Sequence, residues 1–160
     1  MKLRVISEDR LGFTLVELLM VIAISLILAV VAVPIYGSLQ VKSQINESTS
    51  LLIQNLRISK EKSMARFSDS AHGIKFFSDS YVAYQGNSYS TRTASYDRNF
   101  DLGGEVELQW SLSGSGQSDE VNFSKGLGNP DMVGTIEVAS QTIGSSKTIE
   151  INEIGTVQSQ

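Results

Sequence analysis

The chain has 160 residues, with 13 lysines and arginines against 17 aspartates and glutamates, no cysteine, and a formal net charge of −4 at neutral pH. The absence of cysteine excludes disulfide bonds and thiol chemistry, so packing alone must stabilise the fold. The acidic balance disfavours general binding to the phosphate backbone of nucleic acids.

An apolar run covers residues 13–36, and its polar members are only Thr14, Glu17 and Ser25. As an α-helix that rises about 1.5 Å per residue, this run is long enough to cross a hydrocarbon core about 30 Å thick. The cations that precede it, Lys2, Arg4 and Arg10, favour a cytoplasmic N-terminus. The sequence therefore predicts a membrane-spanning helix over residues 13–36, with the remainder of the chain outside the inner membrane.

Glu17 places a carboxylate near the start of this apolar run. An unpaired charge in hydrocarbon costs at least ~2.5 kcal/mol, so such a residue is expected to have a partner. A secretory signal peptide is disfavoured, because its apolar core spans only ~7–15 residues and ends at a small-residue cleavage site. A plain single-span anchor, with Glu17 near the interface, stays open.

Beyond Pro34 the pattern predicts a continuing helix to about Arg66. Apolar or small residues recur at spacings of three and four, as on one face of an amphipathic helix: Val41, Ile45, Ser48, Leu52 and Leu56. Pro34 removes a backbone donor and is expected to kink the helix. Four cations lie near the predicted C-terminal end, where the helix dipole favours them: Arg57, Lys60, Lys62 and Arg66.

After Gly73 the chain changes to short alternating runs separated by Gly, Ser, Asn and Asp. This pattern predicts strands at residues 74–77, 81–85, 106–112, 120–123, 135–138, 148–151 and 156–157. The fold class is therefore α+β: a long N-terminal helix packed on a C-terminal antiparallel β domain. Residues 37–66 are expected to form the amphipathic half of the helix, and residues 67–160 the β-rich domain.

The sequence offers little support for catalysis. His72 is the sole histidine and stands beside a predicted turn, which is typical of a structural residue. Asp119, Glu120 and Asp131 suggest a calcium site, because hard cations prefer oxygen ligands in loops. Their spacing matches no known loop pattern, so we expect solvated turn acids. The prediction is a protein that is not an enzyme and has no cofactor and no metal.

The run Gly12-Phe13-Thr14-Leu15-Val16-Glu17 and the apolar segment after it resemble the class III signal of type IV prepilins and type II secretion pseudopilins. The resemblance implies cleavage between Gly12 and Phe13 by a prepilin peptidase, which leaves residues 1–12 as a leader. It also implies N-methylation of Phe13, a proline at the depth of Pro34, and use of residues 13–36 as the filament-core helix. Glu17 would pair with the Phe13 amine of a neighbouring subunit, which offsets the cost of burying either charge.

The last third of the chain resembles the GspH/FimT group of minor pilins and pseudopilins. The relevant segments are residues 121–126, 134–138, 147–151 and 155–157. In them a Phe-containing strand followed by Gly leads to a Gly-started strand, then to a final strand and a Gly-hydrophobic ending. The same residues are also explained by hairpin chemistry alone, with glycines at turns and alternating apolar positions on half-buried strands.

Together these patterns predict a structural subunit of a type IV filament machine, either the pseudopilus of a type II protein secretion system or a type IV pilus. The implied partners are other pilin-like subunits, the inner-membrane assembly platform and the prepilin peptidase, which also methylates. The expected location is the bacterial inner membrane, single-pass, with a periplasmic β domain. One alternative is a DNA-binding minor pilin, which would use Arg57, Lys60, Lys62, Arg66, Arg92 or Arg98; another is a plain membrane-anchored β domain.

Overall fold

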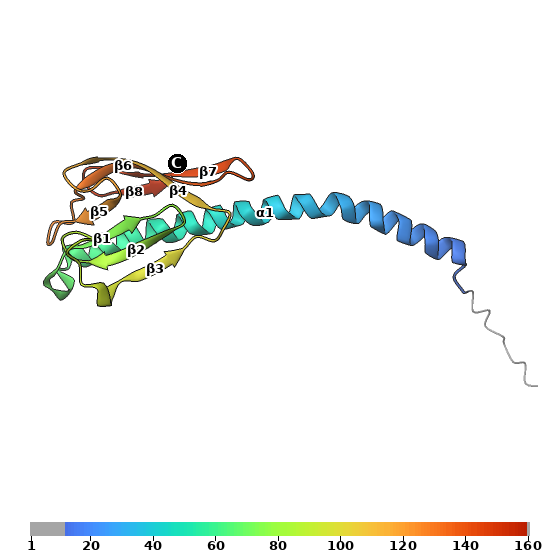
Figure 1. Ribbon diagram of the computed structural model, residues 1–160, viewed down its shortest axis with the longest axis horizontal. Coiled ribbons are helices and arrows are strands. Elements are labelled where there is room, and N and C mark those ends of the chain that lie inside the picture. Colours follow the sequence, from blue (N-terminus) through green and yellow to red (C-terminus); the bar gives the residue numbers. More distant parts are fainter. Residues whose placement is uncertain (1–11, 160) are drawn as a thin grey trace, which may run out of the picture. The chain divides into compact units, whose positions relative to one another are not determined.

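The computed structural model describes residues 12–159, apart from the side chains of residues 31–35. A single α-helix in this range, α1 (Leu15–Met64), is followed by eight β-strands and two short 3-10 helices (Figure 1). The chain divides into two compact units, Met1–Gly37 and Ser38–Gln160, which are described separately below. As expected, α1 continues past Pro34, and it ends close to the predicted limit at Arg66.

The first unit contains the N-terminal half of α1. By length and apolarity, no helix among the described residues qualifies as a membrane span. The membrane-spanning helix predicted over residues 13–36 is not found among the described residues. Pro34 lies among the residues whose side chains are not described, so its kink stays a prediction.

The second unit contains two antiparallel four-stranded sheets, which confirms the α+β class and the antiparallel β domain. One sheet has the order β3-β2-β1-β5 and is built from Arg98–Asp101, Ser80–Gln85, His72–Phe76 and Glu120–Phe123. The other has the order β4-β6-β7-β8 and is built from Glu107–Gly114, Met132–Ser140, Ser145–Ile151 and Val157–Ser159. The short helix η1 (Phe67–Asp69) precedes β1, and η2 (Ala94–Tyr96) lies between β2 and β3 in the sequence.

The predicted strands match seven of the eight observed strands, with shifted ends for most and the same bounds for β5. Strand β3 was not predicted, because it lies in a polar stretch and carries only one apolar residue, Phe100. That residue is sufficient for an edge strand: its ring stacks on Tyr81 of β2, with the ring centroids 4.9 Å apart. Such an aromatic pair adds roughly 0.5–1.5 kcal/mol to the area that it buries.

The predicted apolar face of α1 is the face that packs into the domain. Ile45, Leu52 and Leu56 are at most 2% exposed, and they join a core contributed by both sheets. Every member of this core cluster lies between Ile45 and Val157, and therefore within the second unit. Full burial of each such side chain contributes about 1.5–3 kcal/mol, so the C-terminal half of α1 is integral to the β domain.

Gly134 in β6 is a position where only glycine fits. Its φ of 140° lies in the region that side chains rarely adopt, and a Cβ there would collide with the backbone oxygen of Ser111 on β4. We expect Gly134→Ala to lower the free energy of unfolding by roughly 2–4 kcal/mol, because a backbone contact in a paired strand cannot move aside. Urea titration followed by the fluorescence of Trp110, the sole tryptophan, measures the change.

Gly104 provides the matched control for this substitution, because a Cβ there meets no atom within 4 Å. Gly104→Ala is expected to change the free energy of unfolding by no more than about 0.5 kcal/mol. Equal unfolding midpoints for the two alanine variants would contradict the steric explanation.

Candidate processing and assembly site

The predicted cleavage site lies just before the first helical residue. Gly12 and Phe13 are non-helical, and α1 starts at Leu15. A side chain at Gly12 would meet no atom within 4 Å, and Phe13 is 84% exposed. Nothing among the described residues therefore covers the Gly12–Phe13 bond. The leader residues 1–11 lie outside the described part of the chain, so the cleavage itself stays a prediction.

Thr14 caps the N-terminus of α1. Its carbonyl oxygen accepts a hydrogen bond from the Leu18 N–H (3.1 Å), and its hydroxyl accepts one from the Glu17 N–H (3.2 Å). A threonine followed three residues later by glutamate is the sequence signature of a capping box. This role was missed in the sequence, although Thr14-Leu15-Val16-Glu17 carried the signal.

Glu17 therefore occupies the first turn of α1, where the helix dipole stabilises a negative charge. Its side chain is exposed, and among the described residues its carboxylate has no hydrogen-bond or ion-pair partner. The carboxylate is thus free to pair with a group of another molecule. The predicted pairing with a neighbour's Phe13 amine is not tested by a single chain and stays a prediction.

The apolar side chains around Glu17 have no packing partner in the described part of the chain. The twelve large ones between Leu15 and Val30 are 51–78% exposed. They occupy every side of the helix, as expected for a helix that is buried within a larger apolar assembly or a membrane. A surface of this kind is too large and too continuous to remain in water.

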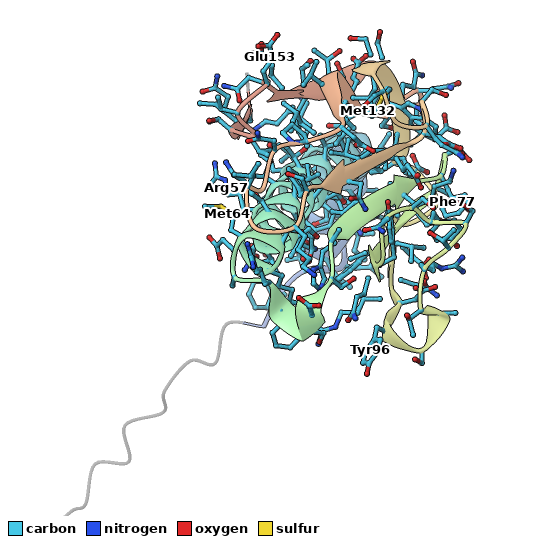
Figure 2. The ribbon with its side chains drawn as sticks, turned by 90° about the vertical axis from the view of Figure 1, so that its left-hand side faces the viewer. Arg57, Met64, Phe77, Tyr96, Met132 and Glu153 are labelled. Atoms are coloured by element: carbon cyan, nitrogen blue, oxygen red, sulfur yellow. The ribbon has the colours of Figure 1, made fainter. Side chains whose placement is uncertain are left out.

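The basic residues of the second unit are largely used within the fold. Arg57 Nη2 donates to the Val157 carbonyl at 2.7 Å, and Lys60 Nζ donates to the carbonyls of Ile154 at 2.7 Å and Gly155 at 3.1 Å. Arg57 therefore ties strand β8 to α1, and Lys60 ties the turn before β8 to the same helix. Arg57 and Met64 lie on the same side of the domain, opposite Phe77 (Figure 2).

Arg92, another of the cations considered for DNA binding, is also engaged. Its Nε donates to Asp97 Oδ2 at 2.7 Å, and its guanidinium lies 3.6 Å from the centre of the Tyr89 ring. Three of the six candidate DNA-binding cations are therefore structural. Lys62 and Arg98 are brought to one cavity, and the Arg66 side chain lies against Gly126.

The three acids considered for calcium do not form one site. Asp119 pairs with Lys75, the Asp131 carboxylate accepts the Asn122 N–H at 2.7 Å, and the Glu120 carboxylate accepts the Tyr89 N–H at 3.0 Å. The expectation of solvated turn acids was wrong, because Glu120 is a strand residue only 2% exposed and the other two are half-buried. No group of three His, Cys, Asp or Glu able to hold a metal occurs among the described residues.

Glu120 makes the stability of the domain depend on pH. Burial raises the pKa of the Glu120 carboxyl, and the nearby Asp131 and Asp119 charges add to this, whereas the Tyr89 N–H and Lys75 oppose it. Above the pKa that Glu120 has in the folded protein, its ionised carboxylate therefore lowers the stability of the domain. This penalty disappears as the pH falls below the pKa of the unfolded chain, near 4.3.

We expect Glu120→Gln to raise the thermal midpoint at pH 7, because an amide oxygen still accepts the Tyr89 N–H without a buried charge. The gain should shrink as the pH is lowered and vanish near pH 4, where the wild-type carboxyl is neutral. Thermal unfolding of both proteins between pH 4 and 8 measures it. A difference that does not change with pH would show that the Glu120 charge is not its cause.

The comparisons with known proteins bear on the N-terminal segment. The family model of the prokaryotic N-terminal methylation motif matches residues 9–33. Neither the curated proteins nor the solved structures gave a match. The matched motif indicates a prepilin-type, type IV pilin-like protein that is membrane-anchored or pilus-associated, and it implies processing by a prepilin peptidase and assembly with other pilins.

Proposed function

We propose that the chain is a non-enzymatic structural subunit, a minor pilin or pseudopilin, of a type IV filament machine. The observation that carries the proposal is the methylation motif at residues 9–33, placed at the start of a helix whose apolar side chains have no partner among the described residues. A bundle of such helices from several subunits would bury those side chains, because each helix would supply the apolar surroundings of the next.

In this proposal the subunit is held at the inner membrane with its N-terminus in the cytoplasm and its β domain in the periplasm. Removal of residues 1–12 creates a cationic amine on Phe13, which is then methylated. Glu17 pairs with the amine of a neighbour and sets the register of the helices. The assembly platform then draws the subunit into a pilus or a short pseudopilus.

We further propose that the subunit is of the GspH/FimT type and serves the pseudopilus of a type II secretion system or a type IV pilus. The segments that carry this resemblance are β5, β6, β7 and the turn before β8. Within these segments, the Gly126 N–H donates to the Ser63 carbonyl at 2.8 Å and so caps the C-terminal end of α1. A glycine with φ of 84° is suited to that turn.

The DNA-binding alternative is less well supported, because Arg57, Lys60 and Arg92 are engaged with the protein itself. The plain membrane-anchored β domain makes a different prediction from the filament subunit. It needs no protein partner for residues 15–30, whereas a filament subunit does.

Site-specific photocrosslinking tests the proposal in cells that contain the filament machine. A crosslinking residue at Leu26, which is 63% exposed, should give adducts with other pilin-like subunits, because this position would lie in the helix bundle. The same residue in a Gly12→Val background is the matched control, and its adducts should be lost because an uncleaved subunit does not assemble. Adducts with lipid alone would favour the plain anchored domain and would overturn the filament role.

A further inference from the structure

The second unit contains a cavity of about 300 Å³ that the filament role does not use. It lies between the last turns of α1 and strand β2, and the short helices η1 and η2 contribute to its rim. Its lining includes Ile58, Lys62, Phe67, His72, Tyr96 and Arg98. A volume of this size is at the lower end of the range of small-molecule sites.

The lining of this cavity is positively charged, although the whole chain has a formal net charge of −4. It includes Lys62 and Arg98 and no carboxylate. Two acids close in sequence to the lining residues are paired elsewhere, since Asp97 accepts from Arg92 and Asp69 pairs with Lys125 at 2.6 Å. Glu61, next to Lys62 in the sequence, lines a different cavity. Among the described residues, the Arg98 guanidinium has no hydrogen-bond or ion-pair partner, and Lys62 has only a ring contact with Phe67.

His72 adds a buried polar group without a partner. The residue is 5% exposed, and its backbone N–H is fixed by a hydrogen bond to the Ser63 hydroxyl at 2.9 Å. Its ring nitrogen Nδ1 is buried and makes no hydrogen bond. Burial, together with the Lys62 charge, lowers the pKa of His72 and so favours the neutral ring, whereas a hydrogen bond with the Ser70 backbone opposes this. Buried polar atoms are normally paired, and an unpaired one such as this is explained by a bound water, an ion or a functional role.

Two exposed aromatic rings flank these polar groups. Phe67 is 57% exposed and Tyr96 is 60% exposed, and both line the cavity with Ile58 and Ala83. The Phe67 ring centre lies 6.1 Å from that of His72. The cavity therefore combines cations with an apolar rim, which suits a ligand that has a charged head and an apolar body. A bare inorganic anion would leave the aromatic surface unused.

We propose that this cavity binds a carboxylate carried on an aromatic or other apolar body. Arg98 and Lys62 would neutralise the carboxylate, because a guanidinium presents a planar fork of donors that matches it. Phe67 and Tyr96 would cover the body of the ligand. The carboxylate belongs either to a free small molecule or to the C-terminal residue of a peptide. The proposal does not depend on the filament role.

Because His72 is the only histidine, its imidazole gives one set of NMR signals that reports directly on the cavity. The full chain would be labelled at histidine and kept in a non-ionic detergent. Benzoate is the first probe, and we expect a saturable shift of the His72 signals together with a rise in the His72 pKa. Arg98→Gln and Lys62→Met should each weaken binding at least roughly tenfold, as expected for loss of a charge-assisted hydrogen bond.

Lys147→Gln is the matched control, because Lys147 is an exposed cation on β7 that is not among the cavity residues. It removes the same charge and should leave benzoate affinity unchanged. An equal loss in all three variants would overturn the proposal, since it would show a general charge effect. The absence of any saturable His72 shift up to high millimolar benzoate would also overturn it.

Two further probes separate the sources of the ligand. A short peptide with a C-terminal phenylalanine carboxylate, compared with its amidated form, represents a protein-borne ligand. Tighter binding of the acid peptide than of benzoate would assign the cavity to peptide termini, whereas weaker binding would assign it to free carboxylates. Inorganic phosphate tests whether the aromatic rings of Phe67 and Tyr96 contribute to binding. Phosphate that binds as tightly as benzoate would overturn the proposal that the ligand has an apolar body.

Discussion

Gly12→Val is expected to abolish removal of residues 1–12, so that the protein keeps its full mass instead of losing Met1–Gly12 and gaining one methyl group on Phe13. A branched side chain would crowd the scissile bond, where glycine allows the backbone to approach an enzyme closely. The substitution should not disturb the fold, because a Cβ at Gly12 meets no atom within 4 Å. Intact-mass measurement of the membrane-extracted protein gives the result directly.

Gly104→Val serves as the control for this experiment, since it adds the same side chain at another open glycine and should be processed normally. Wild-type protein recovered from filaments with residues 1–12 still attached would contradict the processing scheme. It would also remove the basis for pairing between Glu17 and a Phe13 amine.

The helix could be predicted well from the sequence because the spacing of its apolar residues is a local property. The positions Ile45, Ser48, Leu52 and Leu56 repeat at helical spacing, and all four are buried in the structure. Pro34 does not end α1, which continues to Met64, as the amphipathic spacing from Val41 onward predicts. The cap at Thr14 was equally local and could have been predicted from the threonine and glutamate that form it.

The strands show where local patterns are insufficient. Strand β3 exists because Phe100 meets Tyr81, and Arg98 pairs in register with Ala83 of β2. The residues of β3 are mostly polar, so pairing with β2, and not its own sequence, makes this segment a strand. Strand β5 was predicted with its observed bounds, but the burial of Glu120 on it was not, because that burial depends on the segments that pack around the strand.

The roles of the cations depended even more on tertiary contacts. Arg57 and Lys60 appeared in the sequence as part of a basic cluster at a helix end, yet both donate to carbonyls roughly a hundred residues later in the chain. Lys62 and Arg98 come from a helix and an edge strand and meet only in the folded domain. No spacing along the chain encodes such a meeting.

Glu17→Ala should reduce incorporation into filaments by roughly a hundredfold or more, because a buried charge that loses its partner costs about 3–5 kcal/mol. In the proposed filament, that charge is the Phe13 amine of the neighbouring subunit. The start of α1 should survive the substitution, since the Thr14 hydroxyl accepts from the backbone N–H of residue 17 and not from its side chain. Entry into the membrane should be unchanged or improved, because a costly carboxylate is removed.

Thr14→Ala distinguishes this pairing from a simple effect on the helix end. It removes the capping hydroxyl and keeps the Glu17 charge, so it should cost about 1 kcal/mol of helix stability and reduce incorporation far less than Glu17→Ala. The ratio of subunit in sheared filaments to subunit in membranes measures both variants. If Glu17→Ala enters filaments as well as the wild type, or if both variants fail to the same extent, Glu17 does not set the register. In the second case its contribution would lie in the first turn of α1, where the structure places it.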